Sequence, residues 1–142
     1  MAEFGKTIIG GLETCSLPDL GINDMNVRVD TGAKTSSLHV DNLVKYTKDG
    51  VTRVQFDIHP DVHNVSHIVT CHAKVADIRK IKSSNGESEQ RYVIKTPINL
   101  GGHAWDIEIT LTNRADMSYL MLLGREGLGD FFLVDPSEVF LI

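Results

Sequence analysis

The residues with the clearest chemical potential form a short turn after an apolar segment. Residues 27–29 read Val-Arg-Val and lead into the triplet Asp30-Thr31-Gly32. Because glycine tolerates tight turns and close backbone packing, this pattern predicts a carboxylate at the tip of a rigid loop. Such a carboxylate suits the general acid–base hydrolysis of an amide. The triplet alone is common, so a second signal is needed.

Carboxylates can hydrolyse an amide as a pair about 3 Å apart that shares one proton. Like charges at that separation cannot both ionise, so one pKa falls and the other rises, and the titration belongs to the pair. No other aspartate in the chain is followed by Thr-Gly or Ser-Gly. We therefore expect a two-fold homodimer in which each protomer contributes Asp30.

The sequence pattern around this turn predicts that strands position it. Apolar and polar residues alternate over residues 105–112 and over residues 54–58, the period of half-buried strands. Turn signals stand at Asp49-Gly50, Asn85-Gly86 and Gly101-Gly102. The best helix candidate is a turn or two over residues 125–130. We expect one all-β domain over residues 1–142, built as a small closed barrel or sandwich.

A long hairpin is predicted over residues 78–96, with a polar tip over residues 82–89. The tip has little apolar surface to bury, so it should be mobile. An ordinary solvated hairpin would look the same in sequence. Its position between the Asp30 turn and the apolar segment at residues 121–125 favours a lid over a cleft.

Composition excludes several classes of partner. The net charge of −5 argues against nucleic acid, because no basic stripe is present to neutralise phosphates. No apolar run approaches the roughly 20 residues of a membrane span, and residues 1–6 lack the basic and apolar regions of a secretory signal. The two cysteines, Cys15 and Cys71, are too few for a disulfide framework. We expect free thiols, no membrane partner and a cytoplasmic protein.

One histidine pattern bears on metal binding. His59, His63, His67 and Cys71 recur every four residues, and on a helix they would share a face that could bind zinc. Pro60 and the many β-branched neighbours oppose a helix there. The chain also lacks HExxH and GxxxxGK[ST]. We therefore expect no metal and no cofactor, and keep a zinc hydrolase as a minor alternative.

The motifs together resemble those of the retropepsin-like aspartic peptidases. Asp30-Thr31-Gly32-Ala33 resembles the retroviral form of the catalytic turn. Residues 121–125, Met-Leu-Leu-Gly-Arg, resemble the second signature of that family, which lies on the strand beneath the turn. A flap hairpin lies between the two signatures in that family, as residues 78–96 do here.

More specifically, the chain is similar to small bacterial retropepsin-like proteins that carry the name ATP-dependent zinc proteases. These proteins often accompany ATP-grasp glutamate ligases that act on a ribosomal protein. The similarity extends over nearly the whole chain, at residues 6–10, 30–38, 91–94, 111–114, 121–125 and 132–136.

The resemblance implies a retropepsin-like closed acid-protease barrel with a flap hairpin and one short helix after Gly124. It also implies a homodimeric peptidase that hydrolyses a peptide or isopeptide bond, with glutamate-rich or γ-glutamyl tails, such as a ribosomal protein tail, as a substrate class. The alternative is a non-catalytic module on the same fold that binds peptides or mediates assembly. The intact Asp-Thr-Gly favours the enzyme, since a binding module could lose the aspartate.

Site roles follow from the same resemblance. Asp30 is the catalytic carboxylate, Thr31 hydrogen-bonds across the dyad, and Gly32 lets the two loops approach each other. Gly124 should pack beneath the turn. The residues expected at the substrate are Ala33, Lys34, Asn85, Gly86, Gly124 and Arg125.

Two features depart from the retroviral pattern. Lys34 stands where retroviral enzymes carry an aspartate that pairs with the arginine matching Arg125. Lys34 could favour ionised carboxylates at the dyad and acidic groups in the substrate, or it could point to solvent; the sequence leaves both open. The second departure is the long segment over residues 42–80, whose extra strands could close the barrel or reshape the dimer face.

The C-terminal region contains two apolar runs, residues 131–134 and 139–142. In retroviral enzymes the chain ends form a sheet between subunits. Strands inside the protomer explain residues 131–134 at least as well. For residues 139–142 we expect an interface, because an exposed apolar edge otherwise invites aggregation.

Overall fold

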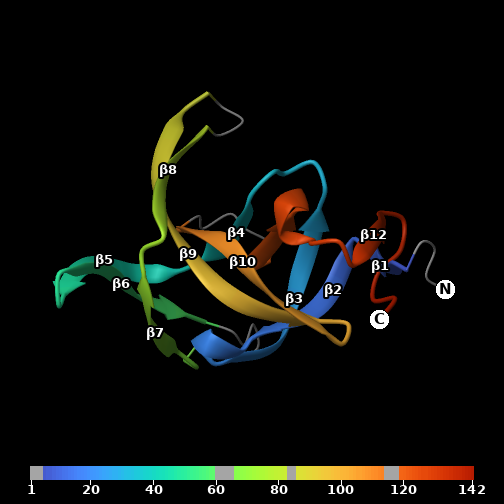
Figure 1. Ribbon diagram of the computed structural model, residues 1–142, viewed down its shortest axis with the longest axis horizontal. Helices are drawn as coiled ribbons and strands as arrows, with labels where there is room; N and C mark the ends of the chain where they lie inside the picture. Colours follow the sequence, from blue (N-terminus) through green and yellow to red (C-terminus); the bar gives the residue numbers. More distant parts are fainter. Residues whose placement is uncertain (1–4, 60–65, 83–85, 114–118) are drawn as a thin grey trace.

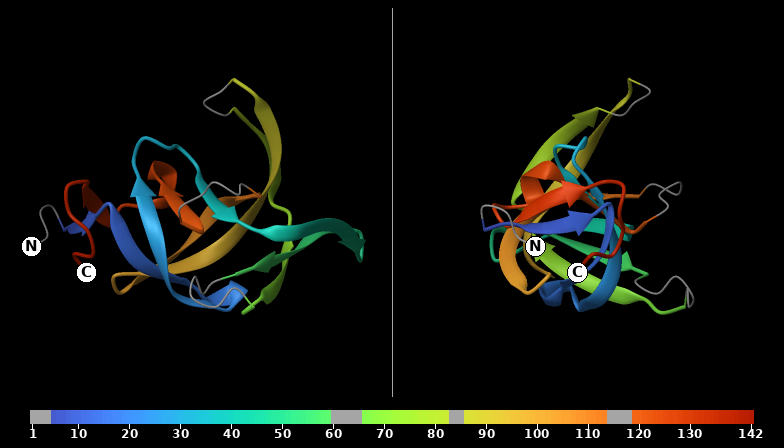
Figure 2. Two further views of the ribbon diagram at one scale, coloured as in Figure 1. Left: turned by 180° about the vertical axis from the view of Figure 1, so that it is seen from behind. Right: turned by 90° about the vertical axis from the view of Figure 1, so that its right-hand side faces the viewer.

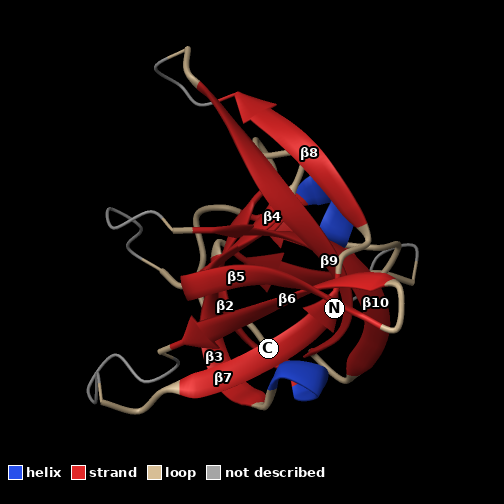
Figure 3. Ribbon diagram, turned by 90° about the vertical axis from the view of Figure 1, so that its left-hand side faces the viewer, coloured by secondary structure: helices blue, strands red, loops and turns tan. Residues whose placement is uncertain are grey.

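Strands dominate the computed structural model, which describes residues 5–59, 66–82, 86–113 and 119–142. Within these ranges the helical segments are two short 3-10 turns, η1 (Pro18–Leu20) and η2 (Arg125–Gly127) (Figure 3). The all-β prediction is confirmed, and η2 is the short helix expected after Gly124. η1 was not predicted; Pro18 begins it and Gly21, at φ 71°, ends it.

Six strands form a closed barrel (Figures 1 and 2). Neighbouring strands pair in the order β10-β4-β11-β3-β2-β9, and β9 pairs back onto β10 to close the ring. Their bounds are β2 (Leu12–Leu17), β3 (Ile22–Asp30), β4 (Ser36–His39), β9 (Ser88–Leu100), β10 (His103–Thr112) and β11 (Met121–Gly124). The expected closed barrel is therefore present.

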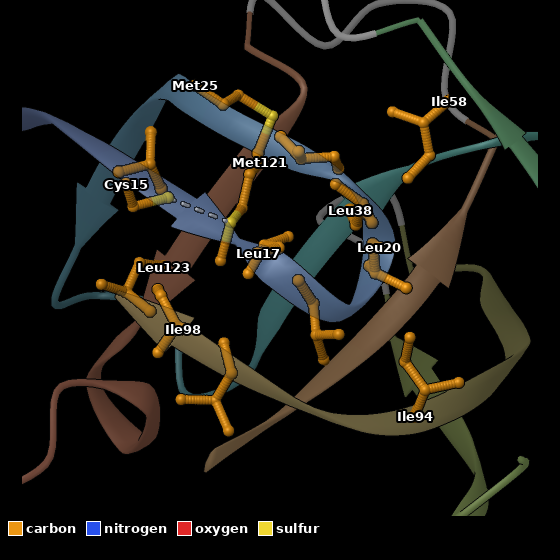
Figure 4. Close-up of a cluster of buried hydrophobic side chains, with 14 of the residues drawn as sticks. Cys15, Leu17, Leu20, Met25, Leu38, Ile58, Ile94, Ile98, Met121 and Leu123 are labelled. Carbon is orange, nitrogen blue, oxygen red and sulfur yellow. Dashed lines mark hydrogen bonds between the residues drawn. The ribbon is translucent and has the colours of Figure 1, made fainter. Parts of the chain in front are cut away.

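The alternation seen in the sequence decides which side chains fill the barrel. On β10, Ile107, Ile109 and Leu111 are buried, whereas Asp106 and Glu108 are exposed. Side chains from β2, β3, β4, β9 and β11 join them in one core (Figure 4). Each fully buried aliphatic side chain contributes about 1.5–3 kcal/mol, so this core can hold the Asp30 turn rigidly.

The predicted hairpin extends from the barrel as a flap. β8 (Asp77–Lys82) pairs only with β9, in a register that runs from Asp77 opposite Val93 to Lys82 opposite Ser88. Figures 1 and 2 show this hairpin projecting beyond the barrel wall. Asn85 lies outside the described residues, and Gly86, at φ 87°, stands between the tip and β9.

The long segment after β4 does not complete the barrel. It forms a separate three-stranded sheet of β5 (Asp41–Lys48), β6 (Val51–Ile58) and β7 (Val69–Lys74), with β6 in the centre. One face of this sheet packs against the barrel through Val54, Phe56 and Ile58, which are fully buried.

The first strand of the chain and the C-terminus lie on the same side of the molecule (Figure 1). β1 (Thr7–Gly10) pairs in parallel with β12 (Phe132–Asp135). Strand formation by residues 131–134 within the protomer is thus confirmed. After β12 the chain returns to β2, where the Phe140 N–H donates to the carbonyl of Leu12 at 2.8 Å.

Candidate active site

Hydrogen bonds within the turn fix the orientation of the Asp30 carboxylate. Asp30 is the last residue of β3, and the buried Val27 and Val29 hold the strand in the core. The Gly32 N–H donates to Asp30 Oδ1 at 2.9 Å, and the Ala33 N–H donates to the Asp30 carbonyl at 3.2 Å. A Cβ at Gly32 would lie 3.1 Å from Asp30 Oδ1. These bonds orient one carboxylate at the end of a strand, as the sequence predicted.

Gly124 packs beneath this turn. β11 runs between β3 and β4, and its register places Gly124 opposite Asp30. A Cβ at Gly124 would lie 2.7–2.9 Å from backbone atoms of Thr35. Only glycine allows the strand to pass this close. The predicted packing of Gly124 is confirmed.

Ser36 is a positioning residue that the sequence analysis missed. Its side chain is buried, and its Oγ accepts a hydrogen bond from the Gly124 N–H at 3.0 Å. Its carbonyl accepts from Thr110 Oγ1 at 2.9 Å. Ser36 thereby joins β4, β11 and β10 directly behind the turn. The sequence feature that could have indicated this role is the pair of serines just before the apolar Leu38.

Arg125 holds the turn through backbone carbonyls. Its backbone N–H donates to the Ala33 carbonyl at 2.8 Å. Its side-chain Nη1 donates to the carbonyls of Thr31 and Gly32 at 3.4 and 3.3 Å. The guanidinium thus stabilises the turn without the carboxylate partner that retroviral enzymes use.

Lys34 faces away from the protomer. Its side chain is 67% exposed, and its Nζ lies 3.8 Å from Glu126 Oε1. Such an exposed pair contributes about 0–1 kcal/mol. The solvent-facing orientation is therefore the one found within a single protomer, and a role for Lys34 at the substrate stays a prediction.

A groove of about 650 Å³ separates the turn from the base of the flap. Thr35 and Ser36 line one side of it, and Arg79 and Lys95 line the flap side. Arg79 donates to Asp77 at 2.9 Å and to both carboxylate oxygens of Glu108 at 3.1 Å. These hydrogen bonds raise the pKa of Arg79 and attach the flap base to β10. Asp30 is not among the residues that line this groove.

The structure brings most of the predicted site together. Residues 30–34, Gly124 and Arg125 form one unit around the turn, with Thr31, Gly32 and Lys34 exposed. Gly86 lies on the flap, and in the described part of the chain no hydrogen bond joins it to the turn. Asn85 falls outside the described residues.

The helix-spaced histidines do not form a helical face. Cys71 lies on β7, where it is buried and its Sγ faces the Leu20 carbonyl at 3.5 Å. His59 pairs with Asp41 at 3.0 Å, and His63 is outside the described ranges. Among the residues described, no group of three or more His, Cys, Asp or Glu side chains could hold a metal ion.

Both cysteines are free and buried, as the sequence analysis expected. No helix in the described ranges is long and apolar enough to cross a membrane.

Comparison with known proteins agrees with the geometry. Residues 8–142 match the RimB-like family model, described as retropepsin-like aspartic endopeptidase RimB. Over 137 residues the chain is 51% identical to a probable alpha-L-glutamate ligase from Shewanella pealeana, covering 96% of this chain and 30% of the relative. A protein of the same name from Desulfotalea psychrophila is 47% identical over 135 residues, covering 95% of this chain and 29% of that relative.

The chain therefore spans about 30% of the length of these curated relatives. Among solved structures, a Legionella pneumophila protein of unknown function superposes with a TM-score of 0.78 at 29% identity. That match covers 95% of this chain and 97% of the other.

Proposed function

The chain belongs to the RimB-like family of retropepsin-like aspartic endopeptidases, and we propose that it hydrolyses amide bonds with an Asp30 dyad formed across a homodimer. The observation that carries the proposal is the turn itself. Asp30 ends β3, its carboxylate accepts from the Gly32 N–H, and Arg125 holds the carbonyls of the residues that follow it in the turn. One protomer supplies one such carboxylate, so a second copy must supply the other.

The chemistry assigned to the dyad is general acid–base catalysis. One ionised carboxylate takes a proton from a water held between the two, and the protonated partner donates to the scissile carbonyl. Thr31 and Gly32 are exposed at the tip of the turn, which is where a two-fold partner would have to approach. Within the protomer the turn is already ordered, so little reorganisation would be needed on dimer formation.

The exposed C-terminal side chains support the dimer. Val139, Phe140, Leu141 and Ile142 are each 43–51% exposed although their backbone is tied to the protomer. Leu133 on β12 is also 40% exposed. A contiguous apolar surface of this kind is typical of an association site, and the proposed partner is a second copy of this chain.

Glutamate-rich chains are the proposed substrates. The relatives are named as probable alpha-L-glutamate ligases, and a ligase of that name would add glutamate to an acceptor. A peptidase domain homologous to part of such proteins would act on chains of the same chemistry, including a glutamate tail on a ribosomal protein. The bond is a peptide or isopeptide bond between acidic residues.

The decisive experiment uses Asp30→Asn. Wild-type protein and the variant are incubated with oligo-glutamate peptides of α and γ linkage, with oligo-glutamine as the uncharged control, and products are followed by mass spectrometry. Loss of general acid–base catalysis typically costs 10²–10⁴-fold, so Asp30→Asn should lose activity by at least about that factor. Asp24→Asn, the same change at an exposed position on β3, should retain it.

Two results would contradict the proposal. Full hydrolysis by Asp30→Asn would exclude the aspartic mechanism. Wild-type protein that binds these peptides yet cleaves none would favour the non-catalytic peptide-binding module.

The dimer is tested by Val139→Asp together with Phe140→Asp. Charges on these exposed positions should shift the sedimentation profile toward monomer and reduce activity in parallel, while the circular dichroism stays that of a β protein. A wild-type protein that remains monomeric at all concentrations, with and without peptide, would contradict the shared dyad.

A further inference from the structure

The sheet inserted between the catalytic turn and the flap has two unlike faces. One face of β6 buries Val54 and Phe56 against the barrel. Successive side chains on a strand point to opposite faces, so Val51, Arg53 and Gln55 lie on the outer face. On this face Arg53 is half-buried and Gln55 is exposed.

Strand pairing gathers cations on this outer face. Arg53 on the central strand pairs with Tyr46 on one side and Lys74 on the other, and Gln55 pairs with His72. Lys48 stands opposite Val51 near the β5–β6 turn. We call Lys48, Arg53, His72 and Lys74 the basic face. These residues line an open groove of about 770 Å³ together with Tyr46 and Gln55.

A hydrogen-bonded row orders the middle of the groove. Arg53 Nε donates to Tyr46 Oη at 3.3 Å, and Tyr46 Oη lies 3.1 Å from His72 Nδ1. The Tyr46 and His72 rings meet edge to face with centroids 6.0 Å apart. The Arg53 guanidinium is therefore held across the sheet through its Nε.

The groove at one end of this face is basic, whereas Asp57 lies on the same face toward the other end of β6. The chain carries a net charge of −5, yet the groove holds Lys48, Arg53 and Lys74 against one carboxylate, Asp49, at its rim. In the described part of the chain no carboxylate lies within ion-pair distance of these three cations, whereas Arg79 and Arg91 on the flap hairpin are paired with acidic side chains.

We propose that the basic face binds an acidic polypeptide segment outside the catalytic cleft. Arginine and lysine pair well with carboxylates, and an arginine with fixed orientation can take one bidentately. The groove is open to solvent and its lining residues come from three adjacent strands, which suits an extended chain. That the bound segment belongs to the substrate rests on the proposed function; the binding itself does not.

An acidic polypeptide fits better than a nucleic acid. Polyphosphate binding depends on neutralising many closely spaced charges, and this face offers three permanent cations on a molecule whose net charge repels phosphate at longer range. Carboxylates on flexible side chains can meet the separated cations one at a time.

In Figure 1 and the left view of Figure 2, the β5–β6 turn lies at the end of the molecule opposite the termini, with the end of β3 between them. A long segment could therefore contact both sites.

The test measures binding rather than hydrolysis, so it is independent of the catalytic proposal. A fluorescent 20-residue oligo-glutamate is titrated with full-length Asp30→Asn protein, which cannot consume the probe if the dyad mechanism holds, and anisotropy is recorded at low and physiological salt. Adding Lys48→Glu and Lys74→Glu should weaken binding about tenfold, because two attractions become repulsions. Binding by the parent protein should weaken as salt rises.

The matched control is Lys45→Glu. Lys45 lies on the same strand but pairs with the buried Val54, so its side chain is on the opposite face. It should bind the probe within about twofold of the parent protein. If the double glutamate variant does not fold, Lys48→Gln with Lys74→Gln replaces it, and a smaller loss of binding is expected.

Three results would overturn the inference. Equal weakening by Lys45→Glu would show that only net charge matters. Unchanged binding in either double variant would show that the basic face takes no part. Tighter binding of a 20-nucleotide single-stranded RNA than of the oligo-glutamate, lost in the same variants, would assign the face to nucleic acid. Failure of the catalytic proposal would appear separately, as an absence of hydrolysis by wild-type protein with this binding intact.

Discussion

The Glu13 carboxylate accepts a hydrogen bond from the backbone N–H of Leu141 at 2.9 Å, which joins the second strand of the fold to the C-terminal end. Glu13 is fully buried. The same carboxylate accepts from the Gly10 N–H at 2.7 Å and from the Ile142 N–H at 3.5 Å. One buried acidic side chain therefore holds the segment whose apolar side chains remain exposed.

Glu13→Gln should loosen this attachment. The amide nitrogen of glutamine would replace an acceptor oxygen and face backbone donors, and a buried unsatisfied group costs about 1–3 kcal/mol. We expect a lower free energy of unfolding by that amount and faster hydrogen exchange at Leu141 and Ile142. Glu126→Gln, at a side chain that is 56% exposed, is the control. Unchanged exchange at both C-terminal amides would contradict the assigned role of Glu13.

Ser36→Ala should destabilise the support behind the catalytic turn. The substitution removes the acceptor of the Gly124 N–H, and a lost hydrogen bond to a buried donor costs about 1–3 kcal/mol. Urea denaturation should show this loss, and activity should fall because the turn is less well held. Ser37→Ala, at the next and only half-buried position of β4, should have a smaller effect. Equal effects of the two variants would argue against a special role for Ser36.

Gly124→Ala should reduce activity more than Ser36→Ala does. The added methyl would lie within 3 Å of the Thr35 backbone, and overpacking of this kind typically costs about 1–3 kcal/mol through backbone shifts. The shift falls directly under Asp30, so activity should decrease more than stability alone explains. Gly11→Ala is the matched control, since its Cβ would meet nothing closer than 3.5 Å. Wild-type activity in Gly124→Ala would show that this close packing is not required.

The two cysteines should resist alkylation in the folded protein. Burial raises the pKa of Cys15 to about 12, and burial together with the Asp57 charge raises that of Cys71 to about 11. Because the thiolate is the reactive species, iodoacetamide near pH 8 should modify neither residue in native protein and both in urea. Mass spectrometry distinguishes these cases, and rapid native labelling of either thiol would contradict the buried, protonated state.

The same pKa shifts predict how the free energy of unfolding changes in alkaline solution. Between the ordinary thiol pKa of 9.0 and the folded values of about 11 and 12, the unfolded chain releases protons that the folded chain retains. The unfolded state is then favoured, so the free energy of unfolding should fall as pH rises through this window. Urea midpoints at pH 8 and pH 10.5 measure the change. A midpoint that rises with pH would contradict the predicted sign.

Local patterns in the sequence were enough for β10, most of β6, the flap hairpin and the Asp30 turn. Alternation over residues 105–112 located β10, and the Asp30-Thr31-Gly32 triplet located the turn, because both depend on residues adjacent in the chain. Family resemblance supplied the closed barrel and the place of Gly124. The sequence could not predict the role of Ser36, because its hydroxyl can accept from the Gly124 N–H only where the fold places β11 beside β4.

The sequence by itself determined the all-β class and the turn that carries Asp30, and the second copy that would complete a dyad stays a prediction. Tertiary structure decided which residues at a distance support them. It placed β5, β6 and β7 in a separate sheet with a basic groove on its outer face, paired Lys34 with Glu126, and placed Glu13 against the C-terminal backbone. The reason is physical: periodicity and turn chemistry are local, whereas charge pairing and hydrogen bonding between strands depend on which segments the closed barrel brings side by side.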